Sequence, residues 1–279
     1  MCRILGSINK PFGYDVLDTI KHGGPDAQNI VTIKSVHDRE VTLGHTRLSI
    51  VDLSDAGSQP MTTQDGRFTI IFNGEIYNHK ELRKNIRFQN FRGHSDTETL
   101  LYYLAEHGID GLSHLNGIFA FALYDNIEKT VLIARDPFGV KPLYYAVNGT
   151  SAVFSSEIRP IRKLISTSVN VEAISLFLSM RHLPSPYTMF NEINKMRPGH
   201  YGIIRLAEES LQIQVFPFIS KSAQQISITF DDAIEEYGRL VKQAITRQMM
   251  GDVDVGVLLS GGVDSALVAA IASRSTSKR

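Results

Sequence analysis

The stretch LNGIFAFALYDNIEKTVLIARDPFGVKPLYYAV, residues 115–147, carries the pattern that decides the fold. Short apolar runs at 118–124, 131–134 and 143–147 are separated by Asn, Asp, Gly and Pro. Apolar runs of this length between turn-forming residues are typical of buried strands joined by turns. The stretch therefore predicts consecutive strands of a sheet.

Similar runs recur on both sides of this stretch. We expect further strands at 4–8, 41–51, 68–72, 201–204 and 213–216. A helix is predicted at 96–107, where Ser95 and Glu98 match a capping box and Gly108 supplies the stop. A second helix is predicted at 171–180. These elements indicate a sheet-rich α+β domain over residues 1–220.

The composition changes from Lys221, where the polar run KSAQQIS is interpreted as a linker. Apolar residues at helical spacing then predict a helix at 231–250. It is followed by a β-branched apolar run at 253–259, the loop SGGVDS and a helix at 266–273. A strand, a glycine turn and a helix open a parallel α/β unit. We therefore expect residues 221–279 to be the first part of a parallel-sheet nucleotide-binding domain.

Composition excludes several classes of protein. The chain has 29 basic and 29 acidic residues, so no net charge favours nucleic acid or an anionic membrane. Its single cysteine permits no intramolecular disulfide, and a reducing cytoplasm is the expected location. The N-terminus lacks a signal-peptide pattern, and polar residues at 260, 264 and 265 interrupt the longest apolar run. An enzyme acting on small molecules is the best fit.

Cys2 is the informative residue of the N-terminus. Removal of Met1 leaves a thiol and a free α-amino group on the same residue, and an amine with a pKa of about 7.7–8.0 can serve as the base for that thiol. Alone, a cysteine at this position is also compatible with a frayed terminus. The apolar residues Ile4, Leu5 and Ile8 favour a strand instead.

Long sequence blocks follow Cys2 in a fixed order. They are GHTRLSIVDLSDAGSQPM, FNGEIYNHKELR, HSDTETLL, LNGIFAFALYD, RDPFGVKPLYY and LPSPYTMFNEINKMRPGHY. In this order they resemble the class II glutamine amidotransferase domain of glutamine-hydrolysing asparagine synthetases. The resemblance implies an αββα sandwich of the N-terminal nucleophile hydrolase type, with Cys2 as the nucleophile.

The resemblance also implies roles for matched residues around a glutamine substrate. Arg47 would bind the α-carboxylate, beside a wall formed by the main chain of Leu48, Ser49, Ile50 and Val51. Asp96, with Glu75, would bind the α-ammonium group, while the Asn73 side chain and the Gly74 N–H would stabilise the oxyanion. Alone, Asn73-Gly74 would indicate a turn and Asp96 a helix-capping choice.

Ser260 to Ser265 form a second motif. The loop lacks the Lys of a Walker A sequence and resembles the pyrophosphate-binding loop of the ATP pyrophosphatases. This implies that Leu259, Ser260, Gly261, Gly262, Asp264 and Ser265 bind ATP, with Mg²⁺, while an acceptor aspartate is adenylated. Glutamine hydrolysis needs no cofactor, and no residue is assigned as a metal ligand.

Two positions depart from the family pattern, which usually begins MCGI and contains HRGPD. This chain has Arg3 beside the nucleophile and Gly23 in HGGPD. We expect Arg3 to point to solvent from an alternating strand. The missing cation at position 23 predicts slower hydrolysis, which Gly23→Arg would correct.

The sequence as a whole predicts a glutamine-dependent asparagine synthetase or a fragment of one. The alternatives are the same architecture with another acceptor, such as a sugar acid, a glutaminase-only fragment, or a silent binding module. The expected partners are glutamine, aspartate and ATP, and a homodimer is left open. Because much of the synthetase half is absent from the sequence, we expect glutamine hydrolysis without asparagine synthesis.

Overall fold

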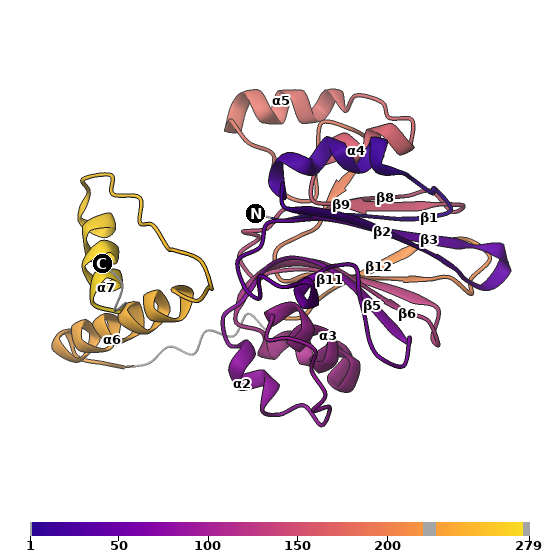
Figure 1. Ribbon diagram of the computed structural model, residues 1–279. Coiled ribbons are helices and arrows are strands. Elements are labelled where there is room, and N and C mark those ends of the chain that lie inside the picture. The colour runs from indigo at the N-terminus through magenta and orange to yellow at the C-terminus, as the bar shows by residue number, and fades with distance from the viewer. Residues whose placement is uncertain (1, 220–226, 276–279) are drawn as a thin grey trace.

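The computed structural model describes residues 2–219 and 227–275, and its strands form two six-stranded antiparallel sheets. The strand orders are β10-β8-β9-β1-β3-β2 in the first sheet and β12-β11-β7-β6-β5-β4 in the second. The sheets face each other, with α4 and α5 outside one and α2 and α3 outside the other (Figure 1). The predicted αββα sandwich is confirmed.

The bounds of the elements are as follows. The first sheet contains β1 (Arg3–Ile8), β2 (Ala27–Lys34), β3 (Glu40–Arg47), β8 (Tyr144–Val147), β9 (Ala152–Ser155) and β10 (Asn194–Lys195). The second contains β4 (Met61–Thr62), β5 (Phe68–Ile76), β6 (Gly117–Asp125), β7 (Thr130–Arg135), β11 (His200–Arg205) and β12 (Ile213–Pro217). The α-helices are α1 (Tyr14–Leu17), α2 (His79–Arg83), α3 (Asp96–His107), α4 (Ile158–Leu164), α5 (Val171–Met180), α6 (Phe230–Gln248) and α7 (Val263–Ser275). Short 3₁₀ helices are η1 (Asp18–Gly23), η2 (Val36–Asp38), η3 (Asp55–Gly57) and η4 (Gly108–His114).

Strand β6 explains why the apolar run at 118–124 is continuous. Phe119, Phe121 and Leu123 belong to the core against α2 and α3. Ala120, Ala122 and Tyr124 belong to the core between the sheets. A strand covered on both faces needs apolar side chains on both, and each buried large side chain stabilises the fold by about 1.5–3 kcal/mol.

Helix α3 begins and ends where the sequence predicts. The Ser95 Oγ accepts a hydrogen bond from the Glu98 N–H at 3.1 Å, and Gly108 has a φ of 59°. The reciprocal half of the capping box is absent, because the Glu98 carboxylate accepts hydrogen bonds from the N–H groups of Arg92 and Gly93. The cap fixes the start of α3, and therefore Asp96, against the second sheet.

The prediction of a strand at 253–259 is wrong. This segment is irregular between α6 and α7, and Leu258 is 96% exposed. A parallel strand needs neighbours to bind its backbone groups, and no strand among the described residues pairs with it. The two flanking helices are confirmed, while most of the predicted linker falls at 220–226, outside the described residues. Strands β2, β4, β9 and β10 were not predicted.

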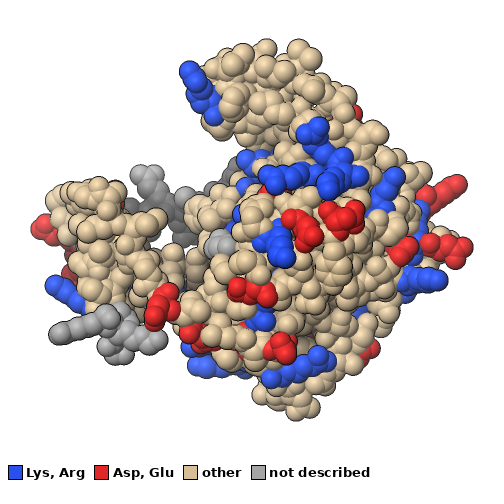
Figure 2. All heavy atoms as spheres, turned by 45° about the horizontal axis from the view of Figure 1, so that its top comes forward, with Lys and Arg blue, Asp and Glu red and all other residues tan. Residues whose placement is uncertain are grey.

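The surface carries both signs of charge. Figure 2 shows Lys and Arg interspersed with Asp and Glu over the displayed face, in keeping with equal numbers of basic and acidic residues. Within residues 2–219 and 227–275, no helix has the length and apolar character needed to cross a membrane.

Candidate active site

Cys2 directly precedes β1, which lies between β3 and β9 in the first sheet. Its Sγ accepts a hydrogen bond from the Leu48 N–H at 3.3 Å and lies 3.5 Å from the Leu48 carbonyl oxygen. Burial raises the pKa of the Cys2 thiol, although the contact with the Leu48 backbone opposes that shift. The thiol is therefore neutral near pH 7 and needs a base before it can act as a nucleophile.

Cys2 opens into a cavity that most of the predicted glutamine-site residues share. The cavity is lined by Cys2, Arg47, Leu48, Ile50, Val51, Gly57, Gln59, Phe72, Gly74, Glu75, Ser95, Asp96 and Thr97. Two predicted residues, Ser49 and Asn73, are not among the lining residues. The Ser49 N–H instead binds the Asp26 carboxylate of the HGGPD loop at 2.8 Å, which anchors the wall from behind.

Arg47 ends β3 and is held by the loop that follows it. Its Nη1 donates to the Ser54 carbonyl at 2.9 Å, and its Nη2 donates to the Asp52 carbonyl. Gly57 packs so closely on the guanidinium that a Cβ there would lie 2.2 Å from Nη2. These contacts fix a buried cation whose other N–H groups remain for a carboxylate.

Asn73 and Gly74 lie inside β5, paired with Ala120 and Phe119 of β6, and do not form a turn. The Phe72 N–H binds Gln59 Oε1 at 2.6 Å and the Ile76 N–H binds Asp96 Oδ2 at 2.9 Å. Because alternate N–H groups of a strand point the same way, the Gly74 N–H also faces this side, where the cavity lies. A side chain at Gly74 would lie 2.1 Å from the Ile118 carbonyl oxygen, so the neighbouring strand requires glycine there.

The Asn73 side chain is also held in place. Its Nδ2 donates to the Ser156 Oγ at 3.3 Å, which leaves the second amide hydrogen for another acceptor. Ser156 Oγ in turn accepts from the Ile4 N–H at 3.0 Å, next to the nucleophile strand.

Glu75 and Asp96 bring two carboxyl groups to the same cavity. Burial, helped by the nearby Asp96 carboxylate, raises the pKa of Glu75 to about 8. Burial raises the pKa of Asp96 to about 6, against N–H groups that favour its charged form. The Lys141 ammonium opposes the shift at Glu75, and its own pKa is lowered by burial. A cation bound between the two carboxyl groups would favour the charged form of both.

Arg3 does not point to solvent, so that prediction is wrong. Its Nε donates to Glu157 Oε1 at 2.9 Å, and its Nη1 donates to the Cys2 carbonyl at 3.0 Å. A Cβ on Gly23 would lie 2.5 Å from Arg3 Cγ, so the side chain lies over this glycine. Arg3 therefore brings a guanidinium to the HGGPD loop, where a missing cation was expected.

The predicted ATP residues lie apart from this cavity, before and at the start of α7. Gly261 has a φ of 84°, and the Ser260 and Ser265 hydroxyls lie 3.0 Å apart. The first N–H groups of a helix have no partner within it, so this loop offers donors suited to phosphate oxygens. Among the described residues, no group of three or more His, Cys, Asp or Glu side chains could hold a metal ion.

Several residues of the cavity were missed at the level of sequence. Gln59 binds Phe72 N–H and donates through Nε2 to the Thr97 Oγ1 at 3.2 Å, which joins β5 to α3. A polar residue in a loop gives no periodic signal in the sequence. Only its place in the block GHTRLSIVDLSDAGSQPM links Gln59 to the site. Chemically, the cavity combines a thiol, main-chain N–H donors, an arginine and a pair of acidic side chains.

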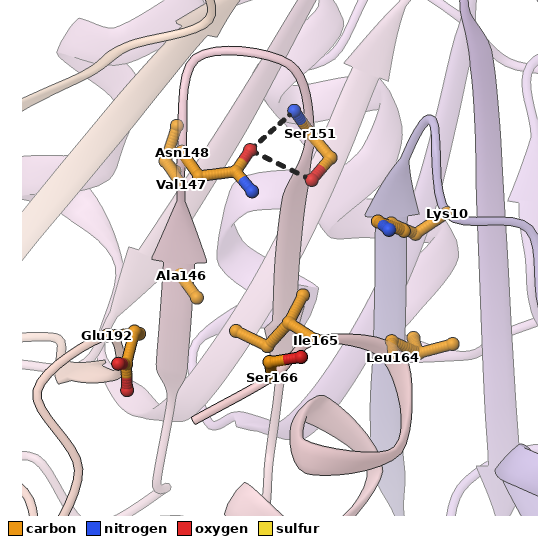
Figure 3. Close-up of a pocket in the computed structure, with 9 residues that line it drawn as sticks. All are labelled: Lys10, Ala146, Val147, Asn148, Ser151, Leu164, Ile165, Ser166 and Glu192. Atoms are coloured by element: carbon orange, nitrogen blue, oxygen red, sulfur yellow. Dashed lines mark hydrogen bonds between the residues drawn. The ribbon is translucent and has the colours of Figure 1, made fainter. Parts of the chain in front are cut away.

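A second hollow lies between the β8–β9 hairpin and the end of α4 (Figure 3). Three of its polar side chains, those of Asn148, Ser151 and Glu192, are hydrogen-bonded within the protein. Asn148 Oδ1 accepts from the N–H and Oγ of Ser151 at 2.9 and 3.0 Å, and Glu192 binds Ser168 at 2.8 and 2.6 Å. The hollow is lined by no cysteine and by none of the predicted glutamine-site residues, so the cavity at Cys2 is the better candidate.

Comparison with protein families assigns both parts of the chain. Residues 1–216 match the family described as glutamine amidotransferase domain, and residues 236–279 match asparagine synthase. The chain is 36% identical over 263 residues to asparagine synthetase [glutamine-hydrolyzing] 3 of Bacillus subtilis, covering 92% of this chain and 41% of that protein. It is 31% identical to a putative asparagine synthetase [glutamine-hydrolyzing] 2 of Methanocaldococcus jannaschii, covering 97% of this chain and 56% of that protein.

Among solved structures, the chain is similar to glutamine phosphoribosylpyrophosphate amidotransferase from B. subtilis complexed with ADP and GMP. The TM-score is 0.57 at 17% identity, over 98% of this chain and 64% of that one. This likeness supports the fold. The chain spans about half the length, or less, of the two curated relatives.

Proposed function

Because this chain belongs to the glutamine amidotransferase family, we propose that it hydrolyses glutamine to glutamate and ammonia with Cys2 as the nucleophile. The observation that carries the proposal is the shared cavity, in which the thiol lies with Arg47 and the acid pair Glu75 and Asp96. This set matches the carboxamide, carboxylate and ammonium of one α-amino acid. A silent binding module would have no use for the buried thiol.

The reaction begins with substrate binding. Arg47 pairs with the α-carboxylate, and the α-ammonium enters between Glu75 and Asp96, displacing the proton that burial holds there. Leu48 to Val51 form the wall alongside. The carboxamide then extends toward Cys2 and the β5 backbone at Gly74.

Two chemical steps follow. The Cys2 amine takes the thiol proton, the sulfur attacks the carboxamide carbon, and the Gly74 N–H and Asn73 amide stabilise the oxyanion. The protonated amine gives its proton to the departing nitrogen, so ammonia leaves and a thioester remains. Water attacks the thioester, glutamate leaves with the new C–O bond, and the thiol regains its proton.

The acceptor of the ammonia is proposed from the second family match, at residues 236–279. We propose an aspartate carboxylate, giving asparagine, with a sugar acid as the alternative acceptor. Ser260, Gly261, Gly262, Asp264 and Ser265, with Leu259 before them, would hold ATP phosphates, and ATP with Mg²⁺ would supply the activation of the carboxylate. We propose the cytoplasm as the location of the protein, because a reducing compartment keeps the Cys2 thiol reduced.

The test is glutamate release from glutamine by the full chain, followed by chromatography. The proposal expects turnover that saturates with glutamine and is absent in Cys2→Ala, with asparagine in place of glutamine giving little product. Glu235→Ala, on the exposed face of α6, is the matched control and should keep the parent rate. Equal release by Cys2→Ala and the parent chain would contradict the proposal.

A further inference from the structure

The segment between α6 and α7 contacts the glutamine cavity through Asp252. Asp252 Oδ2 accepts a hydrogen bond from the Asp52 N–H at 2.7 Å and lies 2.7 Å from His94 Nε2. The Asp252 N–H donates to the Ile50 carbonyl at 2.8 Å. One residue thus contacts two elements that are far apart in the sequence.

The first of these elements is the carboxylate wall. Ile50 lines the cavity, and the Asp52 carbonyl accepts a hydrogen bond from Arg47 Nη2. Asp52 has a φ of 56°, a left-handed conformation that a non-glycine residue adopts only when its surroundings hold it. A single residue, Asp52, therefore separates Asp252 from the arginine proposed to bind glutamine.

The second element is the ammonium wall. His94 directly precedes Ser95, the cap of α3, and Asp96, which line the cavity. The His94 N–H donates to Asp52 Oδ2 at 2.8 Å, so the two walls are already joined behind the cavity. Asp252 closes a triangle of contacts with Asp52 and His94, at the point where the two walls are joined.

We propose that Asp252 is a positioning residue for the glutamine site, supplied by the second domain. Asp252 lies within residues 236–279, the asparagine synthase match, whereas the cavity lies within residues 1–216. The same segment leads into the Ser260 loop, so the two proposed sites are mechanically joined through it. The proposal rests on the proposed glutaminase function and names a residue that acts through Asp52 and His94.

The test compares Asp252→Ala, Asp252→Asn and the control Glu235→Ala in the full chain. Loss of hydrogen bonds of this kind predicts a KM for glutamine raised roughly three- to tenfold in Asp252→Ala, with kcat within about twofold of the parent. The KM of Asp252→Asn should lie between those of the parent and Asp252→Ala, because the amide oxygen can still accept a hydrogen bond from the Asp52 N–H. When His94→Ala is combined with Asp252→Ala, it should raise the KM for glutamine by a smaller factor than it does in the parent chain, because the two residues act together.

The outcomes separate this inference from the function on which it rests. An active parent chain with an unchanged KM in Asp252→Ala, or a fall in kcat alone, overturns the role of Asp252 and leaves the function standing. Calorimetry can make the same comparison without turnover, by measuring glutamine binding to the Cys2→Ala chain with and without Asp252→Ala. A parent chain that neither binds nor hydrolyses glutamine overturns both. Thermal unfolding of each variant confirms that the fold is intact.

Discussion

The sandwich and the C-terminal segment contain similar apolar runs but bury them to different extents. Ile4, Leu5 and Ile8 of β1 are fully buried, whereas Leu258 and Leu259 are 96% and 64% exposed. Strand β1 pairs with β3 and β9, whereas no strand in the part of the chain that the structure describes pairs with the run at 253–259. An apolar, β-branched run therefore forms a strand only where neighbouring strands bind its backbone groups.

The proposed chemistry belongs to the sandwich, so we expect the largest effect at Cys2. A chain extended ahead of Cys2 has no free α-amine and loses its general base. We expect the rate constant for glutamate release to fall by about 10²–10⁴-fold, the range for general-base catalysis. The extension should be cut off by a specific protease to give the matched control. Full activity in the uncut chain would exclude the amine as base.

The next effect should come from Arg47→Ala. Removing one partner of a buried charge pair costs about 2–5 kcal/mol, so the KM for glutamine should rise by tens to thousands of fold. Arg47→Lys keeps the positive charge but loses the planar guanidinium that can bind a carboxylate with two hydrogen bonds. Its KM should lie between those of the parent and Arg47→Ala. Steady-state kinetics decide this, and an unchanged KM would place the glutamine carboxylate elsewhere.

A matched pair of leucines tests the difference in burial directly. Leu5→Ala should lower the free energy of unfolding by about 2–5 kcal/mol, because it leaves a cavity in the core. Leu258→Ala should change it by no more than about 0.5 kcal/mol, because its side chain already lies in solvent. Urea unfolding followed by fluorescence or circular dichroism measures both. Equal losses would mean that the C-terminal segment packs as tightly as the sandwich.

A smaller effect is expected at Gly23. Arg3 already occupies the space over this glycine, so Gly23→Arg should destabilise the chain by about 1–3 kcal/mol and lower its activity. The swap of Arg3→Gly with Gly23→Arg should recover activity, because it returns one guanidinium to the same place. Higher glutaminase activity in the single variant would mean that the cation is missing after all.

The sequence predicted most of the fold because the sandwich pattern is local. Apolar runs between turn residues located the β5, β6 and β7 strands, and Ser95 with Gly108 located both ends of α3. It missed β2, in which four of the eight residues are polar and none is fully buried, as well as β9 and the two-residue strands β4 and β10. The strand at 253–259 was predicted wrongly because pairing is a non-local property.

The site was predicted by resemblance, and its supporting contacts were not. Cys2, Arg47, Gly74, Glu75 and Asp96 line one cavity. The hydrogen bond of Asp252 to Asp52 spans 200 positions, and that of Arg3 to Glu157 spans 154. Such partners have no spacing rule, and Arg3 was expected in solvent because alternation along a strand does not reveal an empty space over a glycine.

The most direct measurement of the central claim is covalent trapping of the nucleophile. A glutamine analogue with an electrophilic carbon in place of the carboxamide should add once per chain, as judged by intact mass. Peptide mapping should place the adduct on Cys2, the chain's single cysteine, with its α-amine free. Excess glutamine should slow labelling, and glutamate release should fall in step with it. An adduct at any other residue, or undiminished glutamate release from fully labelled protein, would contradict the account.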